Sequence, residues 1–186
     1  MAPATQAVPL PPVAKLPDWL RAELRSNHAG ELGSVAIYQG IIAVSKDHRL
    51  REFAAEHLHQ EEEHMAAFDA WLKPSQRRLL LPVGRIAGFM LGALPALIGR
   101  PEVFTAIDAV ERLVILQNGS QISQLETSGQ RGDVNALLRS VCADEEPHQN
   151  DTLQRYPMQR CTPISTIWSS TVSVNSRISV ALARRF

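Results

Sequence analysis

Hydrophobic residues recur at helical spacing along most of the chain, and the pattern predicts a bundle of long helices. The first apolar pattern begins at Asp18, which we expect to cap the helix, and continues to Ile42. A polar break at residues 46–48 separates it from a second helix over residues 49–72, which Pro74 ends. A short break between two long helices predicts an antiparallel hairpin.

The second half of the chain predicts a matching pair of helices. One should begin after Pro101 and run to about Glu126, where a Ser- and Gly-containing turn ends it. Another opens at Asp133. The tail over residues 163–186 has apolar positions that allow an extra amphipathic helix, although its Ser, Thr and Val content also fits a strand. We therefore expect an all-α fold, a four-helix bundle with an extra C-terminal helix.

An apolar stretch over residues 79–99 lies in the long crossover between the two hairpins. Its uncharged part after Arg85 is shorter than the roughly 20 residues that a membrane-spanning helix needs. Several prolines and glycines interrupt it. We expect this segment to lie in a membrane interface, with a core helix as the alternative.

The first 17 residues form a separate region of the sequence. They are rich in proline and contain neither the apolar run of a secretory signal nor the arginines of a transit peptide, so we expect a flexible leader over residues 1–17. With 186 residues and 45% hydrophobic content, the remainder can close one core. Residues 18–186 are thus predicted to form a single domain.

Composition excludes some functions. Lys plus Arg and Asp plus Glu each number 19, so no surplus of positive charge indicates a nucleic-acid partner. Cys142 and Cys161 form no CxxC motif and are expected to be free thiols in a reducing compartment.

The candidate chemistry comes from four glutamates and two histidines that form two copies of one pattern. Each copy has a single glutamate on one predicted helix and a Glu-x-x-His pair on the next. The six residues are Glu31, Glu61, His64, Glu111, Glu145 and His148. This is the ligand set with which ferritin-like bundles hold two iron or manganese ions.

Helix geometry and charge both support a shared site. Residues three apart lie on the same face of a helix, so Glu61 and His64 can both point inward, as can Glu145 and His148. Folding at the polar break brings Glu31 level with Glu61, whereas the second hairpin is the looser match. Four carboxylates balance two divalent ions, and mixed carboxylate and imidazole ligands favour iron or manganese.

Other acidic residues and histidines have less specific interpretations. A single Glu-x-x-His is common on helix surfaces, and the run from Glu61 to Glu63 could be a solvated face. Only Glu61 of that run has the three-residue spacing to His64. His57 and Asp108 lie on the same helix faces as predicted ligands. Two interpretations stay open for them: partners that hydrogen-bond to the ligands, or plain polar neighbours. The remaining histidines are expected to be surface or cap residues: His28, His48 and His59.

Several short segments resemble one family, the demethoxyubiquinone hydroxylases, in order from about residue 16 to residue 153. The segments that carry the resemblance are Asn27-His28-Ala29-Gly30-Glu31-Leu32-Gly33, Tyr38-Gln39-Gly40, Glu61-Glu62-Glu63-His64, Gly88-Phe89-Met90-Leu91-Gly92-Ala93, Ala109-Val110-Glu111 and Ala143-Asp144-Glu145 with His148.

The resemblance implies a ferritin-like di-iron monooxygenase of ubiquinone biosynthesis. Such an enzyme uses two ferrous ions and dioxygen to hydroxylate the ring of a polyprenylated demethoxyubiquinol. By the same resemblance Glu61 and Glu145 would bridge the metals, and the other four residues would be terminal ligands. It further implies a membrane-peripheral protein, and the plain leader favours the cytoplasmic face of a bacterial membrane over the matrix side of the mitochondrial inner membrane. Its partners would be a second copy of the chain and other members of a ubiquinone-biosynthesis complex.

Three residues depart from the family pattern. Gln117 and Asn118 stand where many relatives carry a histidine and a tyrosine, and Pro147 lies inside the second Glu-x-x-His pair, where proline disfavours regular helix. These departures leave open a non-enzymatic module for quinone binding or complex assembly. A ferritin-type iron-oxidising protein, which would use the same six ligands, is the other alternative.

Overall fold

The computed structural model describes residues 15–72, 81–129, 132 and 134–143 of the chain. Its four labelled helices are α1 (Asp18–Val44), α2 (His48–Trp71), α3 (Leu81–Ile98) and α4 (Arg100–Thr127), and residues 134–143 are also helical. None of the described residues lies in a strand. The expected all-α, ferritin-like bundle is confirmed.

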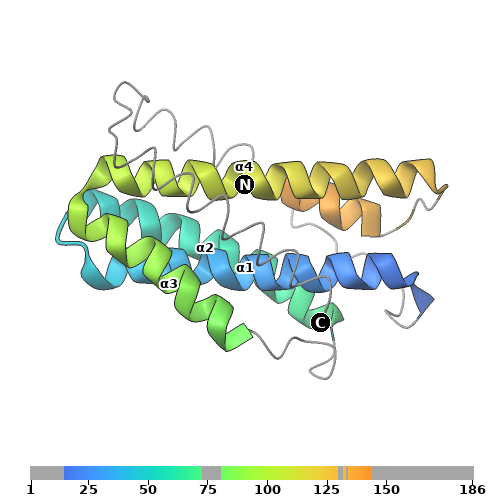
Figure 1. Ribbon diagram of the computed structural model, residues 1–186, viewed down its shortest axis with the longest axis horizontal. Helices are drawn as coiled ribbons and strands as arrows, with labels where there is room; N and C mark the ends of the chain where they lie inside the picture. The colour runs from blue at the N-terminus through green and yellow to red at the C-terminus, as the bar shows by residue number, and fades with distance from the viewer. Residues whose placement is uncertain (1–14, 73–80, 130–131, 133, 144–186) are drawn as a thin grey trace, which may run out of the picture.

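The helices run along a common axis, with one exception. Figure 1 shows α1, α2 and α4 extended along the long axis of the molecule, while α3 lies obliquely across them. Residues 134–143 return beside the end of α4, where Arg139 pairs with Glu126. Residues 134–143, the described part of the helix predicted to open at Asp133, therefore run antiparallel to α4.

The observed helix ends agree with the predicted ones to within two residues, with one wrong cap. The N-cap of α1 is Pro17, and Asp18 is the first helical residue rather than the cap. Asp18 instead lies in the first turn, where a carboxylate interacts favourably with the helix dipole. The N-cap of α2 is Asp47, whose carboxylate accepts hydrogen bonds from the backbone N–H groups of Arg49 (3.1 Å) and Leu50 (3.4 Å).

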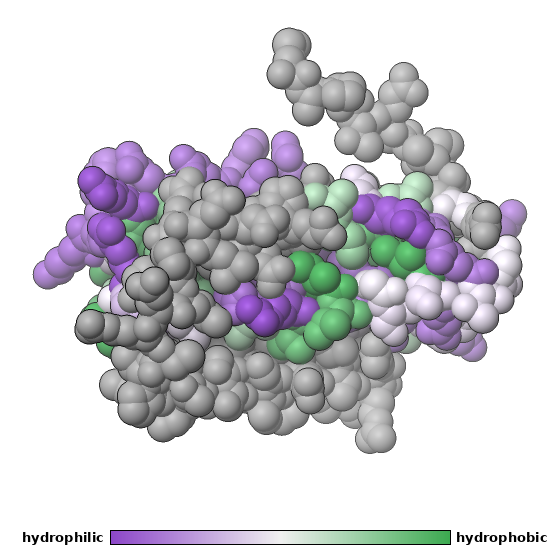
Figure 2. Space-filling model, turned by 90° about the horizontal axis from the view of Figure 1, so that it is seen from above, coloured by the Kyte–Doolittle hydropathy of each residue, from purple (hydrophilic) through white to green (hydrophobic). Residues whose placement is uncertain are grey.

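Asp47 also joins the two hairpins at one end of the bundle. The Nη2 atom of Arg100 donates to Oδ1 of Asp47 at 2.7 Å, and its Nε atom donates to Oδ2. The hydrogen bond from Arg100 holds the pKa of Asp47 below its ordinary value, and Asp47 in turn raises the pKa of Arg100. Hydrophilic residues gather at this end of the molecule in Figure 2.

Two hydrophobic clusters fill the interior on either side of its middle. The first cluster consists of Ile37, Tyr38, Ile41, Leu50, Phe53, Ala54, Val103, Phe104 and Ile107. The second cluster consists of Leu20, Leu24, Phe68, Leu125, Val134, Leu138 and Val141. On each of α1, α2 and α4, a buried glutamate lies between the residues that belong to the two clusters: Glu31, Glu61 and Glu111. The bundle thus encloses a polar layer between two apolar ones.

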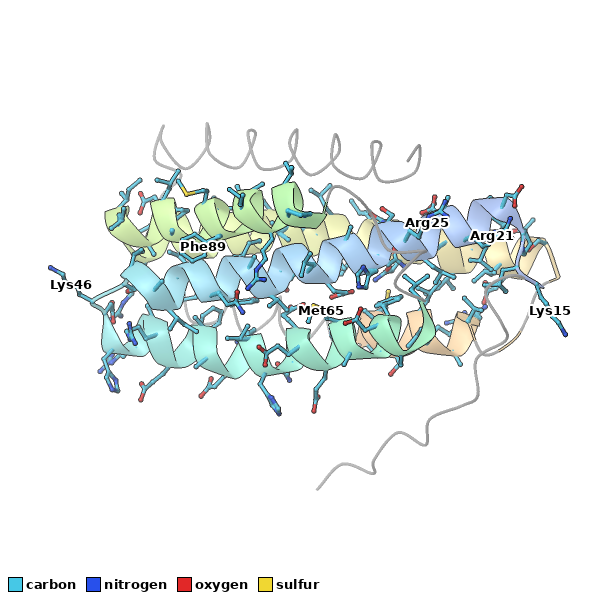
Figure 3. The ribbon with its side chains drawn as sticks, turned by 90° about the horizontal axis from the view of Figure 1, so that it is seen from below. Lys15, Arg21, Arg25, Lys46, Met65 and Phe89 are labelled. Carbon is cyan, nitrogen blue, oxygen red and sulfur yellow. The ribbon has the colours of Figure 1, made fainter. Side chains whose placement is uncertain are left out.

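Helix α3 packs on α1 through glycines that let the two backbones approach closely. A Cβ atom at Gly92 would collide with the carbonyl oxygen of Ile37, and one at Gly88 would lie 2.6 Å from the carbonyl oxygen of Gly33. Phe89 lies on the side of α3 that meets α1 (Figure 3). The segment of α1 that α3 covers therefore adjoins Glu31.

The opposite face of α3 is apolar and exposed. Its exposed large hydrophobic residues are Val83, Ile86, Met90, Leu94, Leu97 and Ile98. Among the described residues, no helix combines the length and hydropathy needed to cross a membrane.

Some predictions fall outside the described residues. They are residues 1–14 of the leader predicted over residues 1–17, the tail helix over residues 163–186, and the fourth-helix positions Glu145, Pro147 and His148. The assignment of residues 18–186 to one domain also stays a prediction.

Replacing Gly92 with alanine should destabilise the fold, because the new methyl group meets a backbone carbonyl that can move only if α1 and α3 separate. We expect Gly92→Ala to lower the free energy of unfolding by about 1–3 kcal/mol, the usual cost of overpacking. Gly84→Ala is the control in the same helix, since a Cβ there meets nothing within 4 Å. It should be neutral or stabilising by up to about 1 kcal/mol. Urea unfolding followed by circular dichroism measures both, and equal stability of the two variants would contradict the close packing.

Candidate metal centre

Glu31, Glu61 and His64 come together in the interior between α1 and α2. One ligand atom of each residue lies within 4.8 Å of the others, and the three residues are 5%, 2% and 8% exposed. Two ligands of one ion, each about 2.1 Å from it, lie at most about 4 Å apart. Small side-chain adjustments would therefore let all three bind the same ion.

The positions of these residues follow from the antiparallel α1–α2 hairpin. Glu31 and Glu61 are equally far in sequence from the turn that joins the helices, so they lie at the same level of the bundle. Glu61 and His64 are three residues apart and both face inward, whereas Glu62 and Glu63 are exposed. Glu61 is thus the inward-facing glutamate of the acidic run, and its role as a ligand stays a prediction.

Glu111 reaches the same layer from α4. It is 4% exposed, and the hydroxyl group of Tyr38 donates to its Oε1 atom at 3.2 Å. Glu111 is not part of the three-residue group, but it lines a small cavity together with Glu61. The cavity residues are Ser34, Ile37, Tyr38, Glu61, Ile107, Val110, Glu111 and Val114. Glu61 therefore belongs both to the three-residue group and to the lining of the cavity that Glu111 reaches.

Burial of these carboxylates has an energetic consequence. A buried ionised carboxylate is costly unless cations or hydrogen-bond donors compensate it. Three glutamates, each at most 5% exposed, converge on this layer together with a histidine. Metal cations are the compensation that fits such a donor set, because carboxylate and imidazole ligands suit iron and manganese.

The other histidines are placed differently from one another. His28 was expected at the surface, and this prediction is wrong: it is 4% exposed, and its Nε2 atom lies 2.8 Å from Oδ1 of Asp69 on α2. The physical reason is that this carboxylate gives an otherwise buried imidazole a polar partner. His48 and His59 are exposed, as predicted.

The two candidate outer residues are both buried. His57 lies against aromatic rings, with ring centroids 4.1 Å from Phe53 and 5.6 Å from Tyr38. Asp108 accepts hydrogen bonds from Nε of Arg112 at 2.9 and 3.0 Å. These contacts make Asp108 part of an ion pair on α4.

A network of side-chain amides between α1 and α4 was not predicted from the sequence. Gln117 donates to Oδ1 of Asn27 at 2.8 Å and to Ser26 at 3.3 Å. Asn27 donates to Gln121 at 2.8 Å, and Gln121 donates to Glu23 at 2.7 Å. The spacing of Gln117 and Gln121, one helical turn apart, is the signal that could have indicated it. Gln117 thus replaces the expected family histidine with a group that binds to α1.

The structure therefore brings three of the six predicted ligands into one group and places a fourth, Glu111, across the adjoining cavity. Glu145 and His148 lie outside the described residues, so their role remains a prediction. Tyr38 was known from the sequence only as part of a family motif, and its contact with Glu111 could not be inferred from spacing alone.

Known proteins are similar to this chain over most of its length. A sequence model of the family described as "Ubiquinone biosynthesis protein COQ7" matches residues 18–183. The chain is 27% identical over 165 residues to the mitochondrial NADPH-dependent 3-demethoxyubiquinone 3-hydroxylase of Dictyostelium discoideum, covering 87% of this chain and 75% of that protein. It is 24% identical over 187 residues to the 3-demethoxyubiquinol 3-hydroxylase of Nitrosospira multiformis, covering 95% and 89%. The matched range spans the positions of all six predicted ligands.

Glu61→Ala should abolish metal binding at this layer, because it removes the carboxylate that the two parts of the site share. Cobalt(II) serves as a spectroscopic probe of metal affinity. Loss of a residue that only hydrogen-bonds to a ligand typically lowers metal affinity roughly 10–100-fold, and we expect the loss of Glu61 to lower it by more. The gain in melting temperature on metal addition should vanish with it. Glu62→Ala is the matched control, since it removes the adjacent exposed carboxylate and should bind like the wild type. Equal binding by both variants would contradict the site.

Proposed function

This chain belongs to the COQ7 family of ubiquinone biosynthesis proteins, and we propose that it is a di-iron monooxygenase that hydroxylates the ring of a polyprenylated demethoxyubiquinol. The observation that carries the proposal is the buried group of Glu31, Glu61 and His64, with Glu111 across the adjoining cavity. Relatives named as demethoxyubiquinone or demethoxyubiquinol hydroxylases match most of the chain.

The proposed ligands are the six residues of the repeated pattern. Glu31 and His64 would bind one ion, Glu111 and His148 the other, and Glu61 and Glu145 would bridge the two. The position of Glu61, in both the three-residue group and the cavity lined by Glu111, supports its bridging role. Once bound, the iron ions would supply activation of dioxygen, the co-substrate, with reducing equivalents from an external donor.

The protein's own contribution is to position these ligands and to keep water out. Apolar residues surround the carboxylates within the cavity: Ile37, Ile107, Val110 and Val114. The two hydrophobic clusters close the bundle on either side. A site shielded from solvent strengthens the electrostatic interactions inside it and protects reactive species from side reactions.

Helix α3 is the proposed contact with the membrane. Its outer face exposes six large apolar side chains, and Arg85 is its one charged residue. Its inner face covers the segment of α1 that carries Ile37, a cavity residue. An isoprenoid tail in the outer part of a lipid leaflet would therefore be held next to the helix that lines the site. We propose peripheral attachment at the cytoplasmic face of a bacterial membrane or its mitochondrial counterpart, where copies of the chain and other biosynthetic proteins would be partners.

The activity can be tested by expressing the chain in a bacterial strain that lacks ring hydroxylation and analysing its quinones by mass spectrometry. We expect the wild type to restore ubiquinone and Glu111→Ala to restore less than a tenth of it, because a coordination position is lost. Glu63→Ala, which removes an exposed carboxylate, is the control. A protein that binds and oxidises iron but forms no quinone product would favour the ferritin-type function. Quinone binding by a protein that retains no iron would favour a non-enzymatic module.

The membrane contact gives a separate prediction. A variant with Ile86→Glu and Leu97→Glu places two charges on exposed positions of α3 and should bind vesicles of phosphatidylethanolamine and phosphatidylglycerol at least tenfold more weakly. Burying each original side chain in lipid contributes about 1.5–3 kcal/mol at most. Leu116→Glu is the control, since Leu116 is 68% exposed, about the same as Ile86 and Leu97 at 66%, but lies on α4. Co-sedimentation measures binding, and equal losses in both variants would exclude α3 as the specific contact.

A further inference from the structure

Tyr38 holds a position that the ligand pattern does not explain. It lies on α1, two turns after Glu31, and is 3% exposed. Its ring is enclosed by two residues of α2: the ring centroid of Phe53 is 6.4 Å away, and that of His57 is 5.6 Å away. This packing fixes the direction in which the phenol hydroxyl points.

The hydroxyl group crosses from α1 to α4 and meets Glu111. An ionised carboxylate can only accept hydrogen bonds, so Tyr38 is the donor in the 3.2 Å contact with Oε1. Tyr38 and Glu111 also line the same cavity as Glu61. One oxygen of Glu111 is thus engaged by a buried donor, at the edge of the space where an ion would meet the carboxylate.

We propose that Tyr38 is a positioning residue for Glu111, whose hydroxyl holds Oε1 and leaves Oε2 as the metal ligand. This inference rests on the proposed function of the site. A carboxylate with one oxygen held by a donor binds a metal through the other, and the donor fixes the rotamer that presents it. Partners of this kind orient a ligand, and their loss typically costs 10–100-fold in metal affinity.

The hydrogen bond from Tyr38 to Glu111 is important for the contact between α1 and α4, because the backbones of these helices approach each other at few points. Side chains therefore set the spacing of the two helices in the polar layer, with Tyr38 on one side of the ligands and the amide network on the other. Without the phenol hydroxyl, the side chain of Glu111 would keep its helix position but lose the bond that fixes its orientation.

The test is a double-mutant cycle on metal affinity, with cobalt(II) titrated into the full chain under anaerobic conditions. Tyr38→Phe keeps the ring and removes the hydroxyl, and we expect it to weaken binding 10–100-fold at one of the two ions. In the Glu111→Gln background, the same substitution should change affinity less than twofold. Thr105→Val is the control, since it removes a hydroxyl that bonds to the backbone of Pro101, away from the cavity.

The outcomes separate this inference from the proposed function. Cobalt binding by the wild type, unchanged in Tyr38→Phe, overturns the role of Tyr38 alone. An equal loss of affinity in the wild-type and Glu111→Gln backgrounds also overturns it, because Tyr38 would then act by another route. Failure of the wild type to bind metal overturns both.

If Tyr38→Phe does not fold, a spectroscopic measurement tests the same proposal. The chain has two tyrosines, so Tyr156→Phe leaves Tyr38 as the only one. The ultraviolet resonance Raman doublet of its phenol reports whether the hydroxyl donates a hydrogen bond. We expect a strong donor in this background and a weaker one after Glu111→Gln, and no difference between the two would overturn the proposal.

Discussion

The structure depends on the compensation of negative charge in the middle of its bundle. Glu31, Glu61 and Glu111 are at most 5% exposed, and each lies between residues that belong to the two hydrophobic clusters. Apolar residues at these positions would pack without any electrostatic cost, so the buried carboxylates support the proposed metal site rather than a role in stability. The clusters supply the burial that drives folding, and the polar layer between them supplies the chemistry.

Helix α3 connects this interior with the exterior. Its glycines bring its backbone against α1 at the segment that adjoins the polar layer, and six of its large apolar residues are exposed on the opposite face. The same helix therefore has a small-residue face for close packing and a large-residue face for an apolar environment.

Periodicity and spacing predicted the helices and the first half of the site, because both depend on local geometry. Glu61 and His64 face inward because they are three residues apart, and Glu31 is level with them because the hairpin is symmetric about its turn. The buried position of His28 was mispredicted, since it depends on Asp69, which is distant in sequence. The bond from Tyr38 to Glu111 and the amides of Gln117 and Asn27 likewise join α1 to α4. Pairings of this kind follow from tertiary packing, which spacing along a helix does not determine.

The amide network has a consequence for how the molecule responds to acid and base. Asn27, Gln117 and Gln121 carry no ionisable proton, so the bonds between them stay the same across the whole range in which the protein is folded. Histidine at the same place would change charge near neutral pH. Changes in acidity therefore leave these amide hydrogen bonds between α1 and α4 without a proton to gain or lose, so this part of the contact does not depend on a charge.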